Sequence, residues 1–318
     1  MLGIYSEGYY DPVLSMRIIQ ELNKLKGFME YFQSNNHPSI PKLLCDIGSL
    51  LAETPLSQMA LPFFTEQLRI EKYYLGYHHP DLASVLFTIG KIYEKNDQLV
   101  EGKKYFMEAF SLLINHKRKG KLYASVIYNI GLVNFRQTLY KDALESFDCA
   151  ITEYYAAYGD FHPAVADVRM KVGTFQLEIG KLQDAMNNFL EALVILRMVF
   201  GNNHYKVAQC LYGIGLIHEA KAEFSEALGV FSQSLSINEN AEDDCDGNDD
   251  DDTFSLVILH RIGLMYQSIE DIDRAFKVFD NLRNLIKLRC CDVDAENKLL
   301  NTFGLNMNDK CVQAAAAA

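Results

Sequence analysis

The sequence of 318 residues has no run of 18 apolar residues, so no segment has the length and apolar character of a membrane-spanning helix. Its first residues lack the basic and apolar regions of a secretory signal. Positive charge is also scarce, since 30 Lys and Arg stand against 42 Asp and Glu and give a net charge of −12. Because affinity for phosphate backbones comes from clustered Lys and Arg, we expect no nucleic-acid partner and no membrane insertion.

Cysteine pairs and catalytic motifs are missing as well. The seven cysteines are odd in number, scattered and without CxxC spacing, which is typical of reduced thiols in a cytoplasmic protein, several of them core residues. No HExxH, GxSxG or P-loop pattern occurs, and the glycines of residues 213–218 lie inside an expected helix instead of following a strand. The sequence therefore predicts a cytoplasmic protein that is not an enzyme and holds no cofactor.

The sequence does contain a repeat, within a globular balance of 49% apolar and 23% charged residues. Glycines separated by 42, 41, 42, 42 and 48 residues stand at Gly48, Gly90, Gly131, Gly173, Gly215 and Gly263. Each is followed after twelve residues by a small residue: Ala60, Gly102, Ala143, Ala185, Ala227 and Ala275. Four residues further on stands a phenylalanine: Phe64, Phe106, Phe147, Phe189, Phe231 and Phe279. We call these the repeat glycines and the repeat phenylalanines.

Each unit is expected to form two antiparallel helices. Apolar residues are spaced by three and four on both sides of a short polar break, which indicates two helices and a turn. The repeat glycine and the small residue let two backbones approach closely, and the repeat phenylalanine should fill the wedge to the next pair. Gly76, Gly159 and Gly201 each precede a repeat glycine by fourteen residues, where the second helix of the preceding unit should end.

Histidines recur eleven residues before four of the repeat glycines: His37, His79, His162 and His204. Three of them precede a proline, which is tolerated in the first turn of a helix because its missing N–H would be unpaired there. With His78 and Asp81 nearby, His79 has the residue types of a metal site. Tetrahedral zinc, however, needs several ligands that converge on one ion, whereas these histidines recur once per repeat. We interpret them as structural residues at the repeat junctions and expect no metal.

The spacing of these residues resembles a known repeat. Gly131, Ala143, Phe147 and Ala150 match positions 8, 20, 24 and 27 of the tetratricopeptide repeat, whose usual unit has about 34 residues. The longer unit and the G-x-x-H-P-x-x-A junction are similar to those of kinesin light chains and nephrocystin-like proteins. We therefore expect an all-α fold, a right-handed α-solenoid of about six helix-turn-helix repeats with capping helices.

The chain is expected to have four parts. They are an N-terminal capping region at 1–36, six repeats at 37–290, a C-terminal cap or tail at 291–313, and a polyalanine remnant or placeholder at 314–318. An acidic run at about 240–252 interrupts the repeats, and its composition predicts a disordered insertion. It makes a poor calcium loop, because Thr253 stands where an EF-hand requires a bidentate glutamate.

The first helix of every unit should line a concave surface. With the repeat glycine as position eight, positions two, five, nine and twelve form one stripe, which is apolar in the central repeats. The Lys and Asn pair with which related repeats grip a C-terminal carboxylate is absent. Asn129 matches the asparagine that resembling proteins use to bond a bound peptide backbone. The expected groove residues are Phe87, Lys91, Tyr128, Asn129, Phe135, Arg136, Met170, Lys171, Leu177 and Tyr212.

Two functions fit these features. The first is a non-catalytic adaptor that binds a partner peptide or helix in the concave groove. The second is a structural scaffold subunit that packs into a larger multiprotein assembly through its outer face and its ends. A third possibility concerns the groove alone, because a tight superhelix or a terminal helix would bury the stripe within the same molecule. For both functions the expected partner is a protein.

Overall fold

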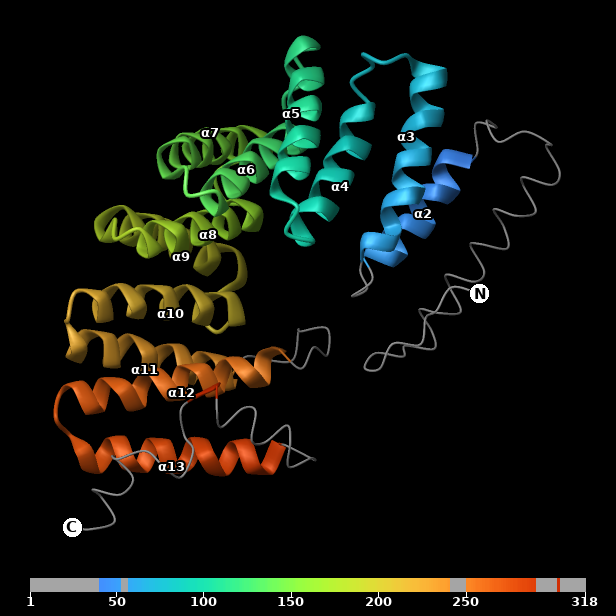
Figure 1. Cartoon of the computed structure of the whole chain (residues 1–318). Coiled ribbons are helices and arrows are strands. Elements are labelled where there is room, and N and C mark those ends of the chain that lie inside the picture. The colour runs from blue at the N-terminus through green and yellow to red at the C-terminus, as the bar shows by residue number, and fades with distance from the viewer. Residues whose placement is uncertain (1–39, 53–56, 241–249, 290–301, 304–318) are drawn as a thin grey trace. The chain divides into compact units, whose positions relative to one another are not determined.

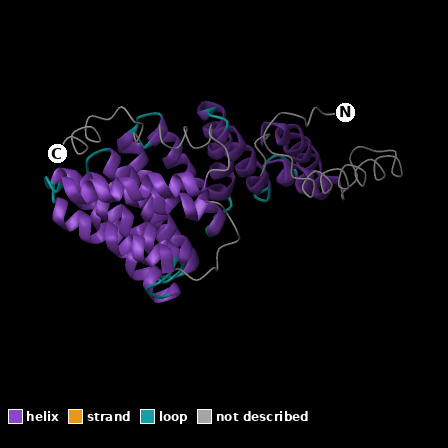
Figure 2. Cartoon of the chain, turned by 90° about the horizontal axis from the view of Figure 1, so that it is seen from below, coloured by secondary structure: helices purple, strands orange, loops and turns teal. Residues whose placement is uncertain are grey.

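A computed structural model gives the fold, and it describes residues 40–52, 57–240, 250–289 and 302–303 (Figure 1). Within these ranges every regular element is a helix and no strand occurs (Figure 2). The chain divides into two compact units, Met1–Ala157 and Tyr158–Ala318, which we describe separately. The expected N-terminal cap and nearly all of the expected C-terminal cap lie outside the described residues.

The helices of unit 1 follow the predicted repeats. They are α2 (Ile40–Ala52), the short 3-10 helix η1 (Ser57–Ala60), α3 (Leu61–Leu75), α4 (Leu82–Lys95), α5 (Leu99–Asn115), α6 (Lys121–Arg136) and α7 (Tyr140–Tyr158), which ends on the first residue of unit 2. α2 packs against α3 and α4 against α5, and each pair belongs to one repeat. The first helices α4 and α6 of successive repeats also contact each other.

Unit 2 repeats this arrangement. Its helices are α8 (Pro163–Glu178), α9 (Leu182–Phe200), α10 (Tyr205–Ala220), α11 (Phe224–Asn240), α12 (Asp250–Ser268) and α13 (Ile272–Arg289). α8 pairs with α9, α10 with α11 and α12 with α13, while α9 packs against α10 and α11 against α12. Figure 1 shows α10 to α13 lying one beneath another. The prediction of an all-α solenoid built from helix pairs is confirmed.

The repeat glycine and the repeat phenylalanine touch within one repeat. A Cβ atom added to Gly90 would lie 2.6 Å from Phe106 Cε1, and one added to Gly131 would lie 2.7 Å from Phe147 Cε1. All six repeats show this contact. The ring thus lies against its own repeat, where we expected it to reach the next pair. Phe189 does both, because Gly213 of the following repeat also packs on its ring.

Histidines cap the helices that begin at the repeat junctions. His162 Nδ1 accepts a hydrogen bond from Ala164 N at 3.1 Å, and His204 Nδ1 accepts one from Lys206 N at 3.1 Å. The imidazole nitrogen therefore does what a Ser or Asp oxygen does at other helix starts. Both rings also pack on the end of the preceding helix: His204 stacks on Phe200, and His162 packs on Tyr158 with the two rings tilted by 37°. The predicted junction role is thus an N-cap, and His37 lies outside the described residues.

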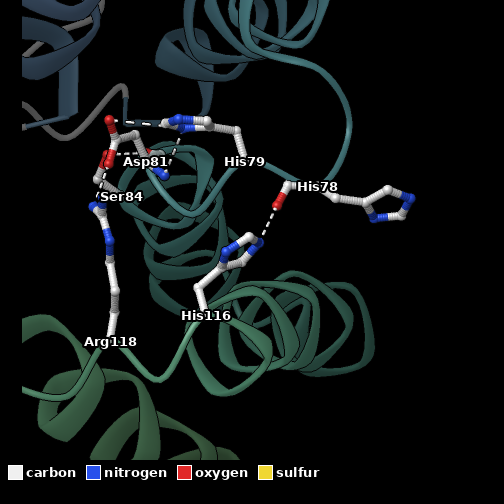
Figure 3. A network of polar contacts seen from close by, with 6 residues as sticks. All are labelled: His78, His79, Asp81, Ser84, His116 and Arg118. Carbon is white, nitrogen blue, oxygen red and sulfur yellow. Dashed lines mark hydrogen bonds and ion pairs between the residues drawn. The ribbon is translucent and has the colours of Figure 1, made fainter.

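Polar contacts tie the junction loops of unit 1 together (Figure 3). His116 Nε2 donates to the carbonyl oxygen of His78 at 2.8 Å, and Arg118 donates to Asp81 Oδ1 at 2.5 Å. His79 Nδ1 accepts from Asp81 N at 3.3 Å, and the ring of His78 points away from it (Figure 3). The two histidines and the aspartate therefore hold the junction instead of converging on one point.

The ends of the second helices fall where glycine predicted them. Gly76, Gly159 and Gly201 have φ angles of +85°, +86° and +83°, which glycine adopts more readily than other residues. One expectation is corrected at the acidic run. α11 ends at Asn240 and α12 begins at Asp250, so residues 250–252 of the expected disordered insertion are helical, and residues 241–249 lie outside the described part.

The glycine contact predicts opposite effects of two Gly→Ala changes in one repeat. Gly215→Ala should destabilise the protein by about 1–3 kcal/mol, because its Cβ would lie 2.5 Å from Phe231 Cε1. Gly229→Ala in α11 should stabilise it by about 0.5–1 kcal/mol, since nothing lies within 4 Å of that Cβ and Ala is the better helix former. Urea unfolding followed by circular dichroism measures both. Stabilisation by both changes would contradict the proposed role of the glycine.

The histidine cap predicts a second pair of results. His162→Ala should lower the free energy of unfolding by about 1 kcal/mol, because Ala164 N loses its acceptor. His162→Asn should cost less, since asparagine is among the best N-cap residues. Thermal unfolding of both variants is the measurement. Equal losses from the two substitutions would show that the histidine contributes its ring contact with Tyr158 and not the hydrogen bond.

Candidate peptide-binding surface

The side chains at position five of the first helices pack on the repeat phenylalanines. In unit 1 the ring centroids of Phe87 and Phe106 lie 5.7 Å apart, and those of Tyr128 and Phe147 lie 5.6 Å apart. In unit 2 the same contact joins Tyr212 to Phe231 at 5.5 Å. In these repeats the stripe that we expected to face a partner therefore also covers the repeat phenylalanine.

Tyr128 and Asn129 are buried, with exposed fractions of 8% and 5%, which corrects the expectation that they line an open groove. Asn129 Nδ2 donates to the carbonyl oxygen of Ser125 at 2.7 Å, within its own helix, so one of its two N–H groups is already used. Burial, with Tyr154 and Glu94 nearby, raises the pKa of Tyr128 well above its usual value. The sequence pattern gives the side of α6 on which both residues lie, but not how closely its neighbours approach.

The other predicted groove residues of unit 1 reach the surface to different extents. Phe87 and Phe135 are half-buried, whereas Lys91 and Arg136 are exposed. Arg136 bonds to Glu94 Oε1 and to Asp97 Oδ1, both at 2.6 Å, and so links the third repeat to the second. The charge of Arg136 is therefore compensated within the protein. In unit 1 the accessible apolar contribution is that of the two phenylalanines.

In unit 2 the predicted residues give a clearer surface. Met170 and Leu177 of α8 are half-buried and lie two turns apart, and Lys171 beside them is exposed. Tyr212 of α10 is half-buried as well, and its ring packs edge-on against Phe254 at 5.4 Å. Since α8 contacts α10, these side chains stand on neighbouring first helices. They offer an apolar surface flanked by a lysine.

Arg261 and Glu219 repeat the link seen in unit 1. Arg261 donates to Glu219 Oε1 at 2.9 Å across 42 residues, the same separation that divides Arg136 from Glu94. Burial, and then the charge of Arg261, lower the pKa of His260, which favours its neutral form. The ring of His260 lies 5.2 Å from that of Phe303, the described aromatic residue of the expected C-terminal cap.

Three sequence predictions concern potential metal ligands, the buried cysteine and the length of the helices in the part of the chain that the structure describes. No group of three or more His, Cys, Asp or Glu lies together there in a way that suits a metal ion. Cys210 is buried as predicted for a core cysteine, and burial raises the pKa of its thiol to about 12. Among the helices described, none is long and apolar enough to cross a membrane.

An apolar stripe on the outer side of α9 was missed by the sequence reasoning. Positions 25, 29 and 33 of the second helices are exposed in all six repeats. In the fourth repeat all three are large and apolar, namely Leu190, Val194 and Met198, exposed by 46%, 57% and 69%. The corresponding residues of the fifth repeat are Ser232, Ser236 and Asn240. Comparison of equal positions among the repeats was the signal that would have found the stripe.

Comparisons with known proteins agree with the geometry. A family model described as Tetratricopeptide repeat matches residues 170–240, and another with the same description matches residues 83–112. The Arabidopsis thaliana protein KINESIN LIGHT CHAIN-RELATED 1 is 26% identical over 193 residues. That match covers 60% of this chain and 30% of the plant protein, so the chain spans less than a third of the relative's length.

Solved structures show the same fold. BtubC (BKLC) from P. vanneervenii has a TM-score of 0.61 and 16% identity, with 73% of this chain and 91% of that chain covered. A chain of the APC/C hetero-tetramer Cut9-Hcn1 has a TM-score of 0.55 and 12% identity, with 91% of this chain and 46% of that chain covered. The glycine and phenylalanine contacts and the helix pairs that they join agree with these matches: the chain contains tetratricopeptide repeats at residues 83–112 and 170–240 and is similar to a kinesin light chain-related protein.

Proposed function

We propose that the protein is a non-catalytic adaptor that binds a peptide or helical segment of a partner protein along its first helices. The observation that supports this most directly is the set of half-buried apolar side chains on neighbouring first helices of unit 2. Met170, Leu177 and Tyr212 are each half-buried, and the Tyr212 ring packs on Phe231 beneath it. Pre-organised apolar anchors of this kind lose little entropy when a partner binds.

The energetics favour a short partner segment. Binding energy in such interfaces concentrates in a few large side chains, each worth about 2 kcal/mol or more when truncated. Met170 and Leu177 are seven residues apart on α8, or about 10 Å at the rise of an α-helix. A partner segment with two or three apolar residues spans this distance. In unit 1, Phe87 and Phe135 offer the corresponding anchors.

The scaffold alternative requires a different surface. A structural subunit would use the outer faces of the second helices and the ends of the array, and it would exchange no peptide. The two functions are therefore distinguished by which helix of a repeat carries the contact. The fourth repeat allows this comparison, because α8 presents the inner anchors and α9 presents the outer stripe.

Replacing the anchors of α8 tests the adaptor function. Met170→Gln combined with Leu177→Gln should weaken binding of a partner segment at least about thirtyfold, the factor that corresponds to one anchor of 2 kcal/mol. The thermal midpoint should change little, because glutamine has a similar length and both sites are only half-buried. Partners captured from cells are identified by mass spectrometry, and the segment of the captured partner is then titrated calorimetrically.

The matched control lies on the other helix of the same repeat. Leu190→Ser, Val194→Ser and Met198→Asn together give α9 the residues of the fifth repeat and should leave segment binding unchanged. Loss of the segment with the outer-face variant, and not with the α8 variant, would refute the adaptor proposal and favour the scaffold.

A further inference from the structure

The fourth repeat has a charged residue where the other repeats bury an apolar one, and apolar residues on an outer face where the other repeats are mostly polar. At position four of the first helix, five repeats bury an apolar residue, namely Leu44, Leu86, Ile127, Leu211 and Leu259. The fourth repeat has Arg169 there, with only 13% of its side chain exposed. On the outer side of its second helix, where other repeats are mostly polar, it has Leu190, Val194 and Met198.

A chain of polar contacts joins α8 to α9 in the fourth repeat. Arg169 donates to Asn188 Oδ1 at 2.8 Å and forms an ion pair with Glu191 Oε2 at 2.6 Å. Asn188 Nδ2 in turn donates to Gln176 Oε1 at 2.8 Å. Asn188 and Gln176 are 8% and 5% exposed, so the network is paired within the protein, as burial of polar groups requires. The network fixes α9 against α8 and leaves the apolar stripe pointing outward.

The stripe has the geometry of one helix ridge. Leu190, Val194 and Met198 are spaced by four residues and extend over about 12 Å of α9. Ridges of this spacing pack into the grooves of another helix. Single exposed apolar residues are ordinary on protein surfaces. Contiguous solvent-exposed apolar residues are typical of a contact surface.

We propose that the outer face of α9 binds a short, basic amphipathic helix of another protein. A second copy of this chain is the weaker candidate, because stable interfaces use about 20–30 residues on each side and the stripe has three. Two copies with a net charge of −12 each would also repel one another. The same charge attracts a cationic helix, and Asp184 on α9 is exposed, whereas the carboxylate of Glu191 already pairs with Arg169.

This proposal is independent of the peptide-binding function, because it concerns the opposite side of the repeat. The probe is a fluorescein-labelled peptide of about 15 residues, made of lysine and leucine with leucine at every third and fourth position, a length at which helices are marginally stable alone. Fluorescence anisotropy measures its binding to the full chain. Leu190→Ser, Val194→Ser and Met198→Asn together should weaken binding at least tenfold, whereas Ser232→Asn with Ser236→Asn, at the equal positions of α11, should leave it unchanged.

A second experiment moves the three apolar residues to another repeat and tests for a gain of binding. Ser232→Leu, Ser236→Val and Asn240→Met move the stripe to α11, and adding them to the α9 triple variant should restore binding. Equal binding by the wild-type chain and the α9 triple variant would overturn the proposal. So would equal binding of a peptide with alanine in place of leucine, which would mean that charge alone attracts it. A dimer in sedimentation velocity that the α9 triple variant dissociates would assign the stripe to a second copy.

Discussion

The contact between the repeat glycine and the repeat phenylalanine sets the distance between the two helices of each repeat. A Cβ at Gly90 would lie closer to the Phe106 ring than real Cβ atoms lie to their neighbours, so the ring needs the hydrogen atom of glycine to fit. With the ring seated, the side chain at position five covers it, as Phe87 and Tyr128 do. The inner surface is thus a second layer over this contact, and packing constrains its composition.

Successive repeats are joined by contacts of a different kind. Histidine N-caps at His162 and His204 fix where a new pair begins, while Arg136–Glu94 and Arg261–Glu219 link one first helix to the next. Both ion pairs are partly buried and span 42 residues of sequence, so they fix the orientation of one first helix against the next. The large apolar contribution comes from the helix pairs themselves, and this leaves individual repeats free to vary their outer faces.

The fourth repeat differs from the others in its core and on its outer face. Its inner anchors Met170 and Leu177 resemble those of its neighbours, but Arg169 replaces a core leucine and α9 is apolar outside. A polar residue in the core is tolerated because Asn188 and Glu191 satisfy it. The two proposed contact surfaces would let this repeat hold one partner on its first helix and another on its second, as the proposed adaptor function requires.

The period of the glycines and phenylalanines determined the fold, because a pattern repeated six times specifies the same helix pair six times. It also located the helix ends at Gly76, Gly159 and Gly201 and the histidines at the junctions. The periodicity of a helix gives the direction of a side chain but not the distance of the neighbouring helix. Only the tertiary structure therefore decided that Tyr128 and Asn129 are buried, that Arg136 is paired with Glu94, and that Leu190, Val194 and Met198 remain uncovered.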